Sequence, residues 1–138
     1  EQRYSGLEKA IETAGLWADR SLVVDAISSE QIGYDAACEL LARGKPFDAI
    51  FAASDLIAIG AMRALAEAGI SVPGDVAVVG FDDIPAASLT TPPLTTIMQD
   101  IRQAGEALVD CVVGQVEGRL PTARVLPARL VVRASSGG

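Results

Sequence analysis

The chain has 138 residues, half of them hydrophobic, with 13 Gly and 7 Pro, which is the composition of a folded domain and not of a disordered segment. Its formal net charge is −7 and its Lys and Arg are scattered, so this segment is a poor candidate for binding nucleic acid phosphates by itself. The absence of His excludes a His-dependent base, a His-rich metal site and a Ser/His triad.

No apolar stretch reaches the roughly 18 residues that span a membrane, and no basic-apolar leader opens the chain, so we expect a cytoplasmic protein. The two cysteines, Cys38 and Cys111, fall in separate helical patterns. We expect them to be free thiols in a reducing cytosol.

Hydrophobic spacing predicts an alternation of helices and strands. The expected helices lie over 3–14, from Ser29 to Gly44, from Asp55 to Gly69 and over 101–117. Buried strands are expected over 22–27, 49–53 and 76–81, followed by an extended segment over 94–98 and a last strand over 125–132. Helices that alternate with fully apolar strands indicate βαβ units. The predicted fold class is therefore α/β, with a parallel sheet flanked by helices.

Polar side chains follow two of the predicted strands at the point where each strand ends. Ser54 and Asp55 come after the second strand, and Asp82 and Asp83 come after the third. Ligands of open α/β sheets bind beyond the carboxyl ends of the strands, and Arg3 and Gln99 could converge on the same edge. We call this edge the rim and expect a ligand there.

The stretch from Phe51 to Asp100, FAASDLIAIGAMRALAEAGISVPGDVAVVGFDDIPAASLTTPPLTTIMQD, closely resembles a segment of LacI/GalR-family transcription repressors. Three sequence motifs of that family occur in this stretch, in the family's order and spacing. They are A-[NS]-D-x-x-A-x-G-A-x-R-A-L, G-x-x-V-P-x-D-V-x-V-V-G-F-D-D and P-x-L-T-T-x-x-Q. The ending VLPARLVVRASSG is similar to that family's last strand, so the resemblance covers 3–137.

The resemblance implies an effector-binding sensor like a type I periplasmic sugar-binding protein, of which this chain is the C-terminal subdomain. Residues 1–98 and 124–134 would form this second subdomain. Residues 99–118 would form a crossover helix that normally packs on a first subdomain, which is absent here. A helix-turn-helix before that subdomain would be the part of the whole protein that contacts operator DNA.

The family places its ligand-binding aspartate at the position of Asp82, where a carboxylate can accept hydrogen bonds from two hydroxyl groups of a sugar. The alternative for Asp82 is a strand-end residue that caps a turn. Arg3 matches a family arginine whose fork suits vicinal hydroxyls or a carboxylate, and its alternative is a solvated charge at a helix start. Gln99 corresponds to a glutamine between the two lobes, or is an exposed polar residue.

Ser54 stands where many relatives have a ligand-contacting Asn or Asp, although it could equally cap a helix. Asp55 and Asp83 are expected mainly to act as cap or turn residues. Ser28 departs from the family, because relatives often have an aromatic residue there that stacks on the ligand. Trp17 is expected in the core or on the surface and not as a stacking platform.

The function implied by the resemblance is that of a transcription repressor domain whose sugar or related small-molecule effector controls operator binding. A periplasmic sugar-binding protein of a transport system is the alternative. An enzyme is disfavoured, because adjacent strand residues such as Asp82 and Asp83 point to opposite faces, and no catalytic residue, metal or cofactor is expected.

A homodimer is expected through the helix from Leu56 to Glu67 and the loop from Pro85 to Pro93. The predicted interface residues are Ile59, Met62, Arg63 and Leu89.

Overall fold

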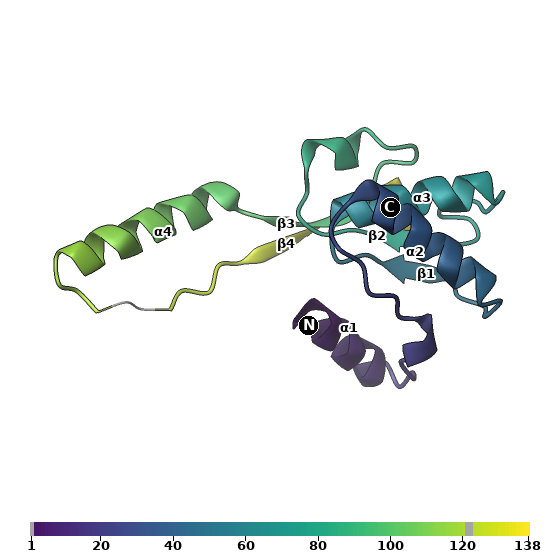
Figure 1. Ribbon diagram of the computed structural model, residues 1–138, viewed down its shortest axis with the longest axis horizontal. Coiled ribbons are helices and arrows are strands. Elements are labelled where there is room, and N and C mark those ends of the chain that lie inside the picture. The colour runs from purple at the N-terminus through teal and green to yellow at the C-terminus, as the bar shows by residue number, and fades with distance from the viewer. Residues whose placement is uncertain (1, 121–122) are drawn as a thin grey trace.

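The computed structural model describes residues 2–120 and 123–138. Its helices are α1 (Gln2–Thr13), α2 (Glu30–Ala42), α3 (Asp55–Glu67) and α4 (Ile101–Val116), and its strands are β1 (Ala49–Phe51), β2 (Ala77–Val79), β3 (Thr96–Gln99) and β4 (Ala128–Val131). Short 3₁₀ helices lie at Arg20–Leu22, Pro85–Ser88 and Ala134–Ser136. Figure 1 shows a compact body and, at one end, α4 extending away from it.

A parallel strand pair forms the centre of the body. β1 and β2 run parallel with Ile50 opposite Val78, and a further parallel bridge joins Val79 to Thr95 as the chain enters β3. β3 then pairs antiparallel with β4, with Gln99 opposite Ala128. This arrangement confirms the predicted α/β class with a parallel sheet flanked by helices.

The strand predicted over 22–27 is wrong. Leu22 ends the 3₁₀ helix Arg20–Leu22 and residues 23–27 have no regular secondary structure. The backbone carbonyls of Ser21 and Val23 accept hydrogen bonds from the Arg43 guanidinium. Ala26 still packs against the core, but Ile27 is exposed. The apolar run correctly indicated contact with the core, whereas a strand also needs a partner for its backbone groups.

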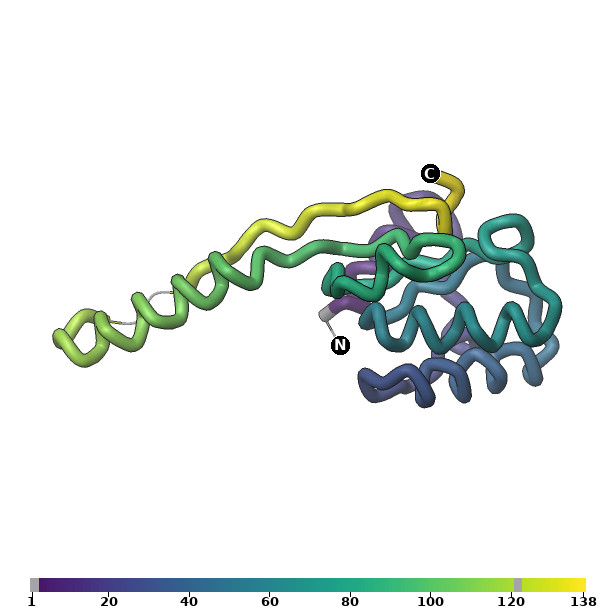
Figure 2. The backbone as a smooth tube through the Cα atoms, turned by 90° about the horizontal axis from the view of Figure 1, so that it is seen from above, coloured from purple at the N-terminus to yellow at the C-terminus, as the bar shows by residue number. Residues whose placement is uncertain are grey.

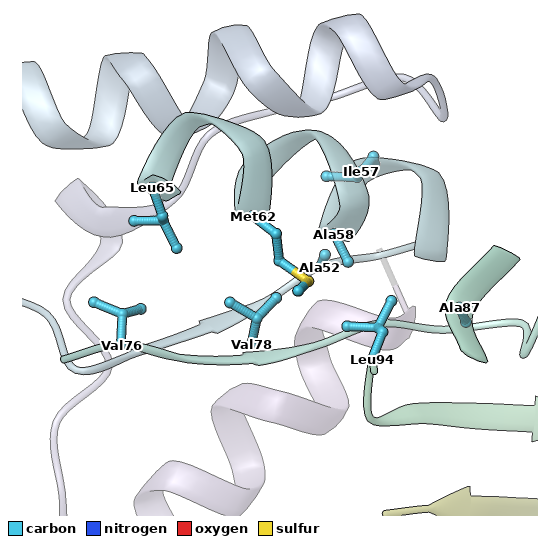
Figure 3. Packing of buried hydrophobic residues seen from close by; sticks show 9 residues of the cluster. All are labelled: Ala52, Ile57, Ala58, Met62, Leu65, Val76, Val78, Ala87 and Leu94. Carbon is cyan, nitrogen blue, oxygen red and sulfur yellow. The ribbon is translucent and has the colours of Figure 1, made fainter. Parts of the chain in front are cut away.

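The core lies between α3 and the strands (Figure 3). Leu65 and Met62 of α3 point toward Val78 and Val76 on the sheet side, and Leu94 closes the cluster near Ala87. Leu65, Val78 and Leu94 are fully buried. This packing fixes the start of α3 against the carboxyl ends of β1 and β2, where the rim residues lie.

α2 covers the outer side of α3 at close range. A Cβ atom added to Gly33 would clash with the backbone of Ile57, and one added to Gly60 would clash with the backbone of Glu30. The two helices can therefore approach only because glycine stands at both contact points.

α4 and residues 123–127, which lead into β4, project together from the body, as Figures 1 and 2 show. An Arg124–Asp110 ion pair of 2.9 Å joins this segment to the helix. Ile101, Leu108, Val112 and Val116 form an apolar stripe along α4, and their exposed fractions run from 61% to 85%. None of the described helices is long and apolar enough to cross a membrane.

Candidate functional site

Three of the four predicted ligand residues meet at the rim. The Gln99 side-chain amide donates a hydrogen bond of 2.8 Å to Asp82 Oδ1, and Arg3 Nη2 lies 3.6 Å from the same oxygen. Arg3 Nη1 also donates to the carbonyl of Ala53, two residues after β1. The Asp82 carboxylate, which follows β2, therefore contacts one side chain from α1 and one from the end of β3.

Arg3 is held in place by an aromatic face as well as by these acceptors. Its guanidinium carbon lies 3.9 Å from the centre of the Phe81 ring, within the range of a cation–π contact. The side chains of Arg3 and Asp82 remain 41% and 33% exposed. The arrangement is thus ordered by its neighbours and still open to a ligand.

The turn that carries Asp82 has an unusual backbone. Asp82 and Asp83 have φ angles of 116° and 56°, a left-handed region in which residues other than glycine are uncommon. The Asp82 amide donates to the carbonyl of Ile97 at 2.9 Å. These two residues do not lie in a regular strand. The alternation that points adjacent strand side chains to opposite faces, which was the reason given against a shared role for Asp82 and Asp83, therefore does not apply to them.

Asp55 holds this turn from below. Its side chain is fully buried, Oδ2 accepts from the amide of Ile84 at 2.8 Å, and Oδ1 accepts from the hydroxyl of Thr96 at 2.5 Å. Asp83 is bound by Arg133 Nη2 at 2.7 Å. The structure thus places both aspartates in supporting roles, as expected, but Arg133 was not anticipated because it lies 50 positions away in the sequence.

Ser54 lies close to the rim but is buried. Its hydroxyl caps α3 by accepting from the Ile57 amide at 3.4 Å, and it shares a 2.8 Å hydrogen bond with the hydroxyl of Ser28. Ser28 itself is exposed. A ligand above Ser54 would therefore meet Ser28 first, a pairing that sequence spacing alone did not reveal. Trp17 is exposed beyond the end of α1, on the surface.

The residues predicted for a dimer interface differ in accessibility. Leu89 is 81% exposed, and Ile59 is half-buried against the core. Arg63 forms a 2.8 Å ion pair with Glu30 of α2. Met62 is 7% exposed and points into the chain's own core, so its inclusion in the interface does not fit the structure.

Two shifted pKa values lie away from the rim. The Tyr34 hydroxyl donates to Glu67 at 2.6 Å, and this bond raises the pKa of Tyr34 to about 12. Hydrogen bonds from Ser21, with a smaller contribution from Lys45, lower the pKa of Asp19 to about 2. Within the ranges that the structure describes, no three His, Cys, Asp or Glu side chains gather to hold a metal ion.

The fold and the rim define a class of protein. Residues 1–136 match the family described as "Periplasmic binding protein-like domain". Ligands of open α/β sheets bind beyond the carboxyl ends of the strands, and Arg3, Asp82 and Gln99 meet at such an edge in this chain.

Within that class the relatives are transcription regulators. The chain is 47% identical over 107 residues to the lactose operon repressor of Rhizobium radiobacter, covering 77% of this chain and 95% of that sequence. The chain belongs to the LacI family of transcription regulators, as the resemblance in the sequence indicated.

Solved structures agree. A complex of the transcriptional regulator CelR with cellobiose has a TM-score of 0.93 at 38% identity and covers 96% of this chain. A lac repressor dimer bound to operator and the anti-inducer ONPF has a TM-score of 0.88 at 32% identity and covers 97%. These relatives favour a regulator over a transport protein.

The chain spans only part of most of these relatives. It covers 41% of the CelR chain and 40% of the lac repressor chain, and 40–41% of several curated regulators that it matches.

Proposed function

We propose that this chain is the part of a transcription repressor that senses a sugar or a related small metabolite. The observation that carries the proposal is the convergence of Arg3, Asp82 and Gln99 on one exposed edge. The carboxylate accepts hydrogen bonds from hydroxyl groups, while the guanidinium and the amide donate to hydroxyl oxygens. A molecule with neighbouring hydroxyls matches this set of donors and acceptors.

The rim favours polar recognition over ring stacking. The serine at position 28 offers a hydroxyl where an aromatic residue would offer a flat face, and Phe81 is already covered by the Arg3 guanidinium. The CelR complex with cellobiose supports a carbohydrate as the ligand class, because that relative has 38% identity and the same fold.

The position of α4 supports a two-lobed sensor. Its apolar stripe is largely uncovered in this chain, which is the property expected of a helix that packs on another domain. In this proposal residues 1–98 and 124–134 form one lobe and residues 99–118 cross to the other. An effector bound between the lobes would favour one relative arrangement and thereby change operator affinity.

Operator DNA and a second copy are the proposed partners of the whole protein. The lac repressor dimer on its operator supports both. Operator contact is assigned to a helix-turn-helix outside this acidic segment, and dimer contact to the surface that includes Ile59, Arg63 and Leu89. Leu89 is the strongest member of that set, because it exposes an apolar side chain in the monomer.

Titration calorimetry on Asp82→Asn in the whole protein, which holds both lobes, tests the ligand role. Mono- and disaccharides, cellobiose included, are first screened by thermal shift, because a ligand that binds the folded state raises the unfolding temperature. Replacement of the carboxylate by an amide should weaken binding of the best sugar about 10- to 100-fold, the loss of one charged hydrogen bond.

Asp35→Asn on the exposed face of α2 is the matched control, and it should bind as the wild type does. Equal affinity of Asp82→Asn and wild type would remove Asp82 from the site. If no sugar binds, the proposed ligand class is wrong.

A further inference from the structure

Arg133 lies directly behind the turn that presents Asp82. Its guanidinium donates to the carbonyl of Leu94 through Nη1 at 2.8 Å and to Asp83 Oδ1 through Nη2 at 2.7 Å. The side chains of Arg133 and Asp83 are only 20% and 17% exposed. A guanidinium that binds two acceptors at once in a half-buried site holds both in a fixed relation.

The turn needs such support, because two consecutive non-glycine residues, Asp82 and Asp83, adopt positive φ angles. Such backbone conformations persist only when the surrounding structure fixes them on several sides. The Asp83 amide donates to Thr96 Oγ1 and the Ile84 amide donates to Asp55, which fixes the backbone. Arg133 fixes the Asp83 side chain, the remaining free group of the turn's second residue.

Both neighbours of the turn belong to the β3–β4 ribbon. Gln99, which donates to Asp82, ends β3, and Arg133 follows β4 by two residues. The backbone of Arg133 is fixed in turn, because its amide donates to Thr95 Oγ1 and its carbonyl accepts from the same hydroxyl. The ribbon therefore holds the turn from the ligand side and from behind.

We propose that Arg133 is a positioning residue for the ligand site, which acts through its ion pair with Asp83 to aim the Asp82 carboxylate at Gln99 and at the ligand. The proposal rests on the proposed ligand role of Asp82. Arg133 would then affect the affinity for the ligand, although it does not itself bind the ligand.

The ligand-free chain provides a direct test by nuclear magnetic resonance. The side-chain amide signal of Gln99 reports its hydrogen bond to Asp82, and Asp82→Asn supplies the reference position for the altered acceptor. We expect Arg133→Gln to move the Gln99 signal most of the way toward that reference and to speed hydrogen exchange at the Asp83 and Ile84 amides, while the far-ultraviolet circular dichroism stays unchanged.

Arg129→Gln is the matched control. Arg129 lies on the same ribbon and contacts Met98 Sδ, so its loss removes the same charge without touching the turn. Arg133→Lys, which retains a cation for Asp83, should keep the Gln99 signal close to that of the wild type. The double variant Arg133→Gln/Asp83→Asn should move it no further than either single change, since both remove one ion pair.

The positioning role is overturned if the Gln99 signal in Arg133→Gln stays at the wild-type position, or if Arg129→Gln moves it equally. If Arg133→Gln does not fold, Asp83→Asn removes the same ion pair and must give the same shift.

Cellobiose is the probe for the ligand measurement, in which Arg133→Gln should raise the dissociation constant about tenfold while Arg129→Gln leaves it unchanged. This measurement uses the whole protein, because the proposed site lies between two lobes. If the wild-type protein does not bind cellobiose, cellobiose is not the ligand, and the resonance result on the chain still decides the role of Arg133.

Discussion

The exposed stripe of α4 predicts that this 138-residue chain associates with itself through that helix. Val112 lies near the middle of the stripe and is 61% exposed. Full burial of a valine or leucine side chain is worth about 1.5–3 kcal/mol, so covering the exposed part of Val112 contributes about 1–2 kcal/mol. A symmetric dimer counts each residue twice, which gives about 2–4 kcal/mol.

Val112→Glu should therefore weaken dimerisation of the chain roughly 30- to 700-fold, because a charge at the centre of the contact removes this burial. Sedimentation equilibrium over a range of protein concentrations measures the change. Gln103→Glu adds the same charge on a different face of the same helix, where the side chain is already exposed and polar, and should leave the dissociation constant unchanged.

A wild-type chain that stays monomeric at high concentration would refute the reasoning. So would a Gln103→Glu variant that dissociates as readily as Val112→Glu, because the effect would then come from charge and not from the stripe.

Three further predictions concern the body. Asp55→Ala should lower the free energy of unfolding in urea by about 3 kcal/mol or more, since it leaves two donors without their buried carboxylate, and Asp55→Asn should lower it less; equal losses would contradict this. Gly60→Ala should lower the free energy of unfolding by about 1–3 kcal/mol, because the added Cβ pushes α2 from α3. Gly105→Ala on α4, with open space around its Cβ, should raise it by up to about 1 kcal/mol. Similar effects of the two substitutions would argue against the close helix contact. Because the folded-state pKa of Tyr34 is raised from 10.0 to about 12, its contribution to stability is complete below pH 10 and lost as the pH rises toward 12; an absorbance titration should show this tyrosine ionising near 12 and Glu67→Gln should return it toward 10, a result that an unchanged titration would contradict.

The sequence pattern predicted the helices well because the local signals agree with the packing. Each of the four helices is followed by a glycine with a positive φ angle, at Gly15, Gly44, Gly69 and Gly118. Such glycines end helices for a reason that needs no tertiary contact, the low cost of the left-handed conformation. The serine caps at the starts of α2 and α3 are equally local.

The wrong predictions concern features that depend on distant parts of the chain. The segment 22–27 has the composition of a strand, but whether it pairs depends on other parts of the chain, and Arg43 takes its carbonyls instead. The apolar periodicity of α3 did not show whether Met62 faces the sheet or a partner. Helical spacing identifies a stripe and does not say which neighbour covers it.

At the rim, one contact could be predicted from the sequence and another could not. The position after a strand end placed Asp82 on the rim, and the structure brings Gln99 to the same edge, as expected, because the carboxyl ends of neighbouring strands share it. The Asp83–Arg133 ion pair joins residues that no short motif connects, and it could be found only once β4 had been placed beside β3.

The attachment of α1 has a consequence for affinity. In the described part of the chain, the side-chain polar contacts between α1 and other segments come from two residues. Arg3 donates to the Ala53 carbonyl and forms an ion pair with Asp82, and Glu8 accepts from Arg20. A ligand that binds Arg3 therefore also selects the docked position of the helix. If α1 is docked only part of the time, the apparent dissociation constant equals the intrinsic one divided by the docked fraction. Residues of α1 that never touch the ligand would then change its affinity by changing how often the helix is in place.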